Sequence, residues 1–146
     1  MASAWIPVLI CLAVISQEST VSFGADHTTG PLRRLFEWML DRRFTADEWW
    51  HLHFAIRKCG HFIGYGLLSA AGFRALWMSS KLTPDSVRRR FGCHALAMLG
   101  TLLVASADEL HQWALPNRSG SLVDVGIDCA GGLLLQMLIW LWMRRA

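Results

Sequence analysis

Residues 123–143 decide the fold, and they read VDVGIDCAGGLLLQMLIWLWM. After Asp128 the stretch carries no charge, and its one amide, Gln136, is expected to make a hydrogen bond to a neighbouring helix. About 20 apolar residues in an α-helix cross the roughly 30 Å of bilayer hydrocarbon. A helix also satisfies its own backbone hydrogen bonds, which lipid cannot do. The stretch therefore predicts a membrane-spanning helix that begins with two carboxylates, Asp124 and Asp128.

Three other apolar segments extend this interpretation to the rest of the chain. They cover residues 4–20, 61–78 and 91–107. The first segment is short and contains Pro7, but it has no basic residues before it and no small-residue cleavage site, so a span is favoured over a cleaved signal peptide. The expected fold is all-α, a bundle of four transmembrane helices forming a single domain over residues 1–146.

The composition agrees with a membrane protein and argues against other classes. The chain has 53% hydrophobic residues and eight Trp against one Tyr, and its mean hydropathy is +0.33. The excess of basic residues, +3 overall, lies in short clusters beside apolar segments, which indicates topology signals and no nucleic-acid partner. The four cysteines are far apart and form no CxxC pair, so they do not indicate a zinc or redox motif.

The basic clusters also predict the orientation. Lys81 and Arg88–Arg90 lie between the second and third spans, and Arg144 and Arg145 end the chain. Basic residues accumulate in cytoplasmic segments. Both termini are therefore expected in the cytoplasm, with residues 16–58 and 108–122 on the outer side of the membrane.

The first outer loop is expected to contain two short amphipathic helices. Residues 31–40 have apolar side chains at helical spacing after Pro31, and residues 45–56 begin with a capping-box pattern, Thr45 to Glu48. These helices would lie on the outer membrane surface or form a lid over the bundle, and the pattern does not choose between the two. In the span that follows, Gly60 and Gly64 form a GxxxG pair, which predicts close helix packing.

Polar residues cluster where three of the predicted spans reach the outer side. Within each cluster the key side chains are three or four residues apart, so they share one helix face. A charge within a membrane costs about 2.5–3.5 kcal/mol on insertion scales, so it is retained where it is paired or functional. The clusters predict one polar pocket, formed by Lys58, His61, Tyr65, Asp108, Glu109, His111, Gln112, Arg118, Ser119, Asp124 and Asp128.

The chain resembles the VanZ-like family of bacterial membrane proteins at these clusters. The matching motifs are Lys58-x-x-His61-Phe62-x-x-Tyr65, Asp108-Glu109-x-His111-Gln112 and Pro116-x-Arg118-Ser119-Gly120-Ser121-x-x-Asp124-Val125-x-x-Asp128-x-x-Gly131. Two departures are Asn117, where the family often has Gly, and Asp128, where it often has Asn. The resemblance implies a four-span protein of the bacterial inner membrane. The founding member is linked to resistance to the glycopeptide antibiotic teicoplanin, which points to the cell envelope.

Three functions are compatible with the pocket. The leading hypothesis is recognition of an envelope lipid or a glycopeptide-type small molecule, with membrane lipids as partners. The second is a membrane-embedded hydrolase or transferase acting on a lipid headgroup, in which His61 or His111 would transfer protons. A divalent cation held by Asp108, Glu109, Asp124 and Asp128 would suit that chemistry. The third is a structural cluster in a protein that binds another membrane protein.

The predicted topology can be tested by labelling. Single-cysteine variants near positions 58, 112 and 120 should react with a membrane-impermeant thiol reagent applied to the outer side of intact cells. Each position lies where a span is expected to meet the outer surface, so all three should react alike. A site labelled only after the cytoplasmic side is opened would contradict the shared outer pocket.

Overall fold

The computed structural model describes residues 2–80, 86–115 and 120–145. Over these residues the chain is helical and contains no strand. The helices are α1 (Ala2–Glu18), the short 3-10 helix η1 (Val21–Phe23), α2 (Ala25–Met39), α3 (Ala46–Ser79), α4 (Val87–Trp113) and α5 (Leu122–Arg145).

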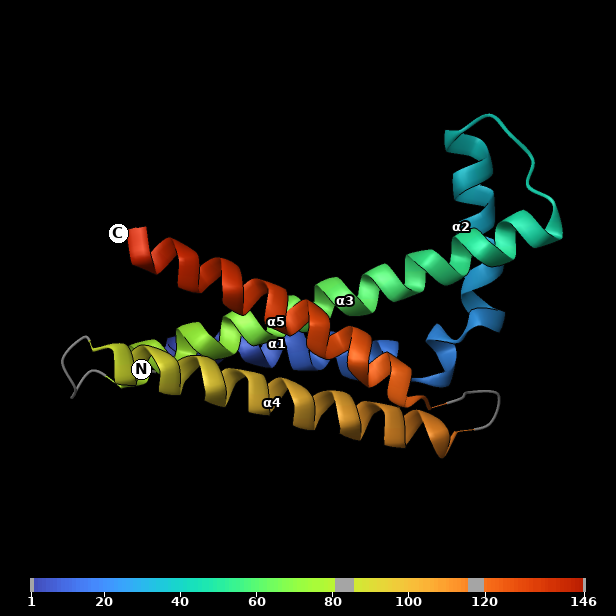
Figure 1. Cartoon of the computed structure of the whole chain (residues 1–146). Helices are drawn as coiled ribbons and strands as arrows, with labels where there is room; N and C mark the ends of the chain where they lie inside the picture. Colours follow the sequence, from blue (N-terminus) through green and yellow to red (C-terminus); the bar gives the residue numbers. More distant parts are fainter. Residues whose placement is uncertain (1, 81–85, 116–119, 146) are drawn as a thin grey trace.

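Four of the helices, α1, α3, α4 and α5, form a bundle in which α3 packs against the other three (Figure 1). α1 begins and α5 ends at the same end of the bundle. By length and apolar composition α4 and α5 each suffice to cross a membrane, and α1 taken with the bent segment after it is a third candidate. Large apolar side chains also face outward on α1 and α3, such as Leu9 at 63% exposure and Ile63 at 58%. The predicted all-α membrane bundle is confirmed.

The helices differ from the expected segments in the first loop. α2 is a separate helix, as expected, but it is longer than residues 31–40 and has Pro31 in its interior. The second expected helix, residues 45–56, is not separate, because α3 runs without interruption for 34 residues. Thr45 caps this helix through the predicted capping box, and no proline follows within it to break the backbone ladder. At about 1.5 Å per residue α3 is about 51 Å long, so its first turns extend beyond the bundle.

A buried tryptophan connects α2 to this protruding part of α3. Trp49 is 3% exposed, and its ring lies 6.1 Å from that of Phe36 and 5.8 Å from that of Phe44. One turn later, His53 stacks on Trp49 and its ring nitrogens meet the hydroxyl groups of Thr28 and Thr29 at 3.1 and 3.3 Å. α2 is therefore attached to the N-terminal turns of α3, before the first residue of the predicted pocket.

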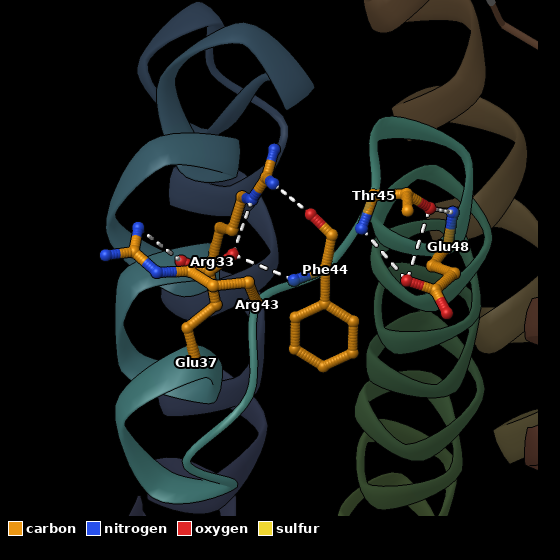
Figure 2. A network of polar contacts seen from close by, with 6 residues as sticks. All are labelled: Arg33, Glu37, Arg43, Phe44, Thr45 and Glu48. Atoms are coloured by element: carbon orange, nitrogen blue, oxygen red, sulfur yellow. Dashed lines mark hydrogen bonds and ion pairs between the residues drawn. The ribbon is translucent and has the colours of Figure 1, made fainter.

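A glutamate holds the connection between α2 and α3, as Figure 2 shows. Glu37 Oε1 accepts hydrogen bonds from the Phe44 backbone N–H and from Arg33 Nε, both at 3.0 Å. Arg33 donates in turn to the Phe44 carbonyl, and Arg43 lies 3.8 Å from the second Glu37 oxygen. The hydrogen bond from Phe44, followed by the one from Arg33, lowers the pKa of Glu37 below its ordinary 4.5.

Glycines allow α5 to approach α3 closely. A Cβ atom on Gly131 would lie 2.0 Å from the carbonyl oxygen of Phe62, so the two backbones touch there. Gly66 of α3 lies against the same part of α5, since a Cβ atom on Gly66 would lie 3.2 Å from the Gly131 carbonyl oxygen. Gly60 and Gly64, the predicted packing pair, have nothing within 4 Å, so that prediction is wrong. Their face of α3 is the one that exposes Ile63, whereas the bundle-facing side carries Tyr65 and Gly66.

Polar side chains also join the helices at the middle of the bundle. Gln136 of α5 donates at 2.8 Å to both the carbonyl and the hydroxyl oxygen of Ser69 on α3. Its own carbonyl oxygen contacts His94 of α4, and the His94 ring stacks 4.2 Å from Phe73. The expected interhelical hydrogen bond of Gln136 is therefore confirmed, and His94 is a packing residue.

Substitution at Gly131 tests the α3–α5 contact. Gly131→Ala should lower the stability of the bundle by about 1–3 kcal/mol, because the added methyl group must push the two backbones apart. Thermal melting in detergent measures the effect. Gly126→Ala in the same helix is the matched control, since a Cβ there meets nothing within 4 Å. Equal melting temperatures for the two variants would contradict the contact.

The hydrogen bonds of Glu37 predict that the stability of the connection between α2 and α3 depends on pH. Because the pKa of Glu37 is lower in the folded protein than in the unfolded chain, its stabilisation is present above its ordinary value of 4.5. The stabilisation should be lost as the pH falls through the lowered pKa. Amide hydrogen exchange of Phe44, corrected for its intrinsic pH dependence, should accelerate there. Glu37→Ala, which has no acceptor for the Phe44 N–H, should exchange fast already at pH 7, whereas Asp41→Asn, an exposed residue of the same connection, should match the wild type.

Candidate functional site

Polar side chains meet at the end of the bundle where α1 and α4 end and α5 begins. They come from one face of α3, from the last turns of α4 and from the first turns of α5. We call this group the polar site. It consists of eight of the predicted pocket residues, namely Lys58, His61, Tyr65, Asp108, Glu109, Gln112, Asp124 and Asp128.

The outer part of the polar site is an ion pair between α3 and α5. Lys58 Nζ donates to Asp124 Oδ1. The side chains are 26% and 20% exposed, so water screens the pair in part. Lys58 Nζ also lies 5.1 Å from the centre of the Phe54 ring, one turn earlier in α3. The contact joins the start of α5 to α3 and neutralises one carboxylate.

The inner part is built around a fully buried carboxylate. Asp128 has 0% exposure, and its Oδ1 lies 3.3 Å from His61 Nδ1. Tyr65, one turn further along α3, stacks on the His61 ring at 6.2 Å and is 1% exposed. Among the described residues, neither Asp128 oxygen nor the Tyr65 hydroxyl has a hydrogen-bond partner of good geometry. A buried polar atom of this kind costs about 1–3 kcal/mol, and more when charged, unless something binds it.

Glu109 links the end of α4 to the start of α5. Its Oε2 accepts the backbone N–H of Ser121 at 2.8 Å, while its buried Oε1 has no hydrogen-bond partner in the described part of the chain. Gly120 is needed at the same place, because a Cβ there would lie 2.2 Å from the Glu109 carbonyl oxygen. The end of α4 and the start of α5 are thus held together at the polar site, and one buried Glu109 oxygen has no partner among the described residues.

Asp108 and Gln112 form a third pair on α4. Gln112 Nε2 donates to Asp108 Oδ2 at 3.0 Å, and both side chains are buried. The spacing of four residues places them one above the other on the helix. Asp108 is therefore engaged within α4, as Asp124 is engaged with Lys58.

The remaining predicted residues take other places. His111 is exposed, and its Nδ1 lies 3.0 Å from the hydroxyl of Ser19, just after α1. Arg118 and Ser119 lie outside the described residues. The sequence reasoning missed Ser19, although the polar run 16–20 directly after an apolar helix is a signal for such a contact. It also missed the backbone N–H of Ser121, which no side-chain pattern reveals.

The carboxylates predicted to hold a cation are only partly brought together. Glu109 and Asp128 approach each other, but the third group beside them is His61, and the donor atoms of these three residues lie within 4.8 Å of one another. Asp108 and Asp124 have Gln112 and Lys58 as partners instead. The most compact set of candidate ligands in the described chain is therefore one histidine and two carboxylates.

The fold and the polar site define a small helical membrane protein with a buried ionisable centre at one end of its bundle. The sequence model of the VanZ/LLP1 family matches residues 4–143, nearly the whole chain. The chain belongs to the VanZ/LLP1 family, which confirms the resemblance carried by its motifs. No curated protein and no solved structure matches the chain.

Proposed function

We propose that the polar site binds the polar head of an amphiphilic molecule of the cell envelope, either an envelope lipid or a glycopeptide-type molecule with a lipid tail. The protein would lie in the bacterial inner membrane with both termini in the cytoplasm. In that orientation the polar site opens to the outer side, where such molecules are found.

The observation that carries this proposal is a set of buried polar atoms without partners at the edge of an apolar surface. Within the polar site, the buried atoms without a hydrogen-bond partner among the described residues are both Asp128 oxygens, Glu109 Oε1, the Tyr65 hydroxyl and His61 Nδ1. Ionisable groups at membrane depth cost free energy and are therefore expected to have a function. A polar head would complete their hydrogen bonds.

The surroundings of the polar site suit a lipid tail. Large apolar side chains are exposed next to it on α4 and α5, with Trp113 at 72%, Leu122 at 90% and Val123 at 71% exposure. A molecule that arrives through the membrane would keep its tail on this surface while its head enters the site. Tryptophan at such a position also suits the membrane–water interface.

The charge of the site favours a head with hydrogen-bond donors. Among its described residues four carboxylates face Lys58 and His61. Carboxylates accept hydrogen bonds, so hydroxyl and ammonium groups of sugars, amino sugars or lipid heads are the complementary chemistry.

Native mass spectrometry of the purified protein tests this proposal. The probes are phosphatidylethanolamine, phosphatidylglycerol, undecaprenyl phosphate and teicoplanin, each added to delipidated protein. Asp128→Asn and Glu109→Gln should weaken binding of the preferred probe about tenfold or more, since a hydrogen bond to a charged group contributes about 1.5–3 kcal/mol. Asp47→Asn, an exposed carboxylate on α3, is the matched control and should bind as the wild type does. Equal binding by all variants would refute the proposal.

The second candidate, a membrane-embedded enzyme, is favoured by the His61–Asp128 pair. A carboxylate beside a histidine ring is an arrangement used in general acid–base catalysis. The same samples distinguish the two functions, because an enzyme would leave a new product in the lipid extract that disappears in His61→Gln and persists in the exposed-residue control His51→Gln. If instead the variants lose folded protein, the polar site has a structural role.

A further inference from the structure

We infer that His61, Glu109 and Asp128 form a binding site for one divalent transition-metal ion, with Zn²⁺ and Mn²⁺ as the matching ions. The inference deepens the proposed function, because the ion would contact an oxygen atom of the bound polar head. It rests on the proposed function only for the identity of that head. Metal binding itself needs no lipid and can be measured alone.

The geometry of the three side chains carries the inference. Each residue comes from a different helix, and their donor atoms lie within 4.8 Å of one another. Two ligands about 2.0–2.2 Å from a tetrahedral ion lie about 3.3–3.6 Å apart, so the donor atoms of the more distant pairs need to approach each other by at most about 1.5 Å. One pair, His61 Nδ1 and Asp128 Oδ1 at 3.3 Å, already has the separation of adjacent ligands.

Burial without partners is the second and independent observation. Asp128 is fully buried and Glu109 is 5% exposed. Within the described residues, both Asp128 oxygens and Glu109 Oε1 lack hydrogen-bond partners. The His61–Asp128 contact leaves Asp128 Oδ2 and Glu109 Oε1 unsatisfied, whereas an ion at the centre of the group binds all three residues at once. Buried charges are found where they are paired or coordinate metals.

The donor types select the class of ion. The imidazole nitrogen suits Zn²⁺ and the two carboxylates also suit Mn²⁺, whereas Mg²⁺ and Ca²⁺ prefer oxygen ligands throughout. One histidine and two carboxylates also leave at least one coordination position of a tetrahedral ion to water or to an oxygen of a bound head. Asp108 and Asp124 lie outside the compact group of donor atoms and have Gln112 and Lys58 as partners.

The contacts around the three residues orient them for this role. The backbone N–H of Ser121 holds Glu109 Oε2 at 2.8 Å, which fixes the carboxylate against the start of α5 and leaves the buried Oε1 without a hydrogen bond in the described chain. Asp128 lies one turn before Gly131, whose contact with the Phe62 carbonyl presses α5 against the turn of α3 that carries His61. Hydrogen bonds and packing of this kind fix metal ligands in position.

Metal analysis of the full-length protein in detergent tests the inference. After treatment with a chelator, the wild type should take up one Zn²⁺ or Mn²⁺ per chain by elemental analysis, and its melting temperature should rise by several degrees, with little response to Mg²⁺. Co²⁺ should give a visible absorption spectrum whose intensity reports the coordination geometry of the bound ion. All samples carry Cys59→Ser, because this exposed thiol would bind metal on its own.

Substitutions identify the ligands. His61→Gln, Glu109→Gln and Asp128→Asn should each weaken metal binding at least tenfold, while Asp124→Asn and Asp47→Asn should change it less than threefold. Glu109→Gln keeps an acceptor for the Ser121 N–H, so this variant is expected to fold even if Asp128→Asn does not. The inference is overturned if the wild type binds no stoichiometric ion, or if binding survives all three ligand substitutions or is lost in Asp124→Asn.

A final measurement separates this inference from the proposed function. Probe binding is compared in metal-loaded and chelator-treated wild type. Failure of metal uptake with intact probe binding would overturn the metal site alone. Metal uptake with no probe binding would overturn the proposed function and leave the ion site in place.

Discussion

The close contact between α5 and α3 at Gly131 is the constraint on which the site depends. The notional Cβ of Gly131 would overlap the Phe62 carbonyl, so these helices approach more closely there than any larger residue permits. Asp128 lies three residues before Gly131 and His61 directly before Phe62, so the same contact brings the carboxylate against the imidazole. Lipid offers no hydrophobic drive between helices, and small residues at the crossing supply the packing instead.

Polar contacts join the same helices at two depths, but they differ in kind. At the middle of the bundle, Gln136 satisfies its amide through Ser69 and His94, which gives a contact that holds the helices in register. At the polar site the carboxylate oxygens outnumber the hydrogen-bond donors of the described residues. Both Asp128 oxygens and Glu109 Oε1 have no hydrogen-bond partner among these residues. The first arrangement leaves one buried atom, His94 Nε2, without a partner, whereas the polar site leaves five such atoms among the described residues. The second has a free-energy cost that structure alone does not offset, and this difference supports a functional role for the polar site.

Hydrophobic length and helix spacing made most of the architecture predictable. The helical membrane bundle, the capping box at Thr45 and the stripe from Lys58 to Tyr65 depend on residues close in sequence, so they could be inferred without coordinates. Two predictions were wrong for one reason: the separate helix at residues 45–56 and the packing role of Gly60 and Gly64. A short motif does not reveal whether a helix continues through it, or which of its faces turns toward the bundle.

The sequence by itself determined that three polar clusters reach one end of a membrane bundle, because the lengths and charges of its segments are local properties. Only the tertiary structure decided how the carboxylates divide their partners. Asp124 meets Lys58 and Asp108 meets Gln112, while Asp128 and Glu109 converge on His61. That division follows from the rotation and depth of each helix against its neighbours. Both depend on close backbone contacts, that of Gly131 with Phe62, far earlier in the chain, and that of Gly120 with Glu109 of the preceding helix.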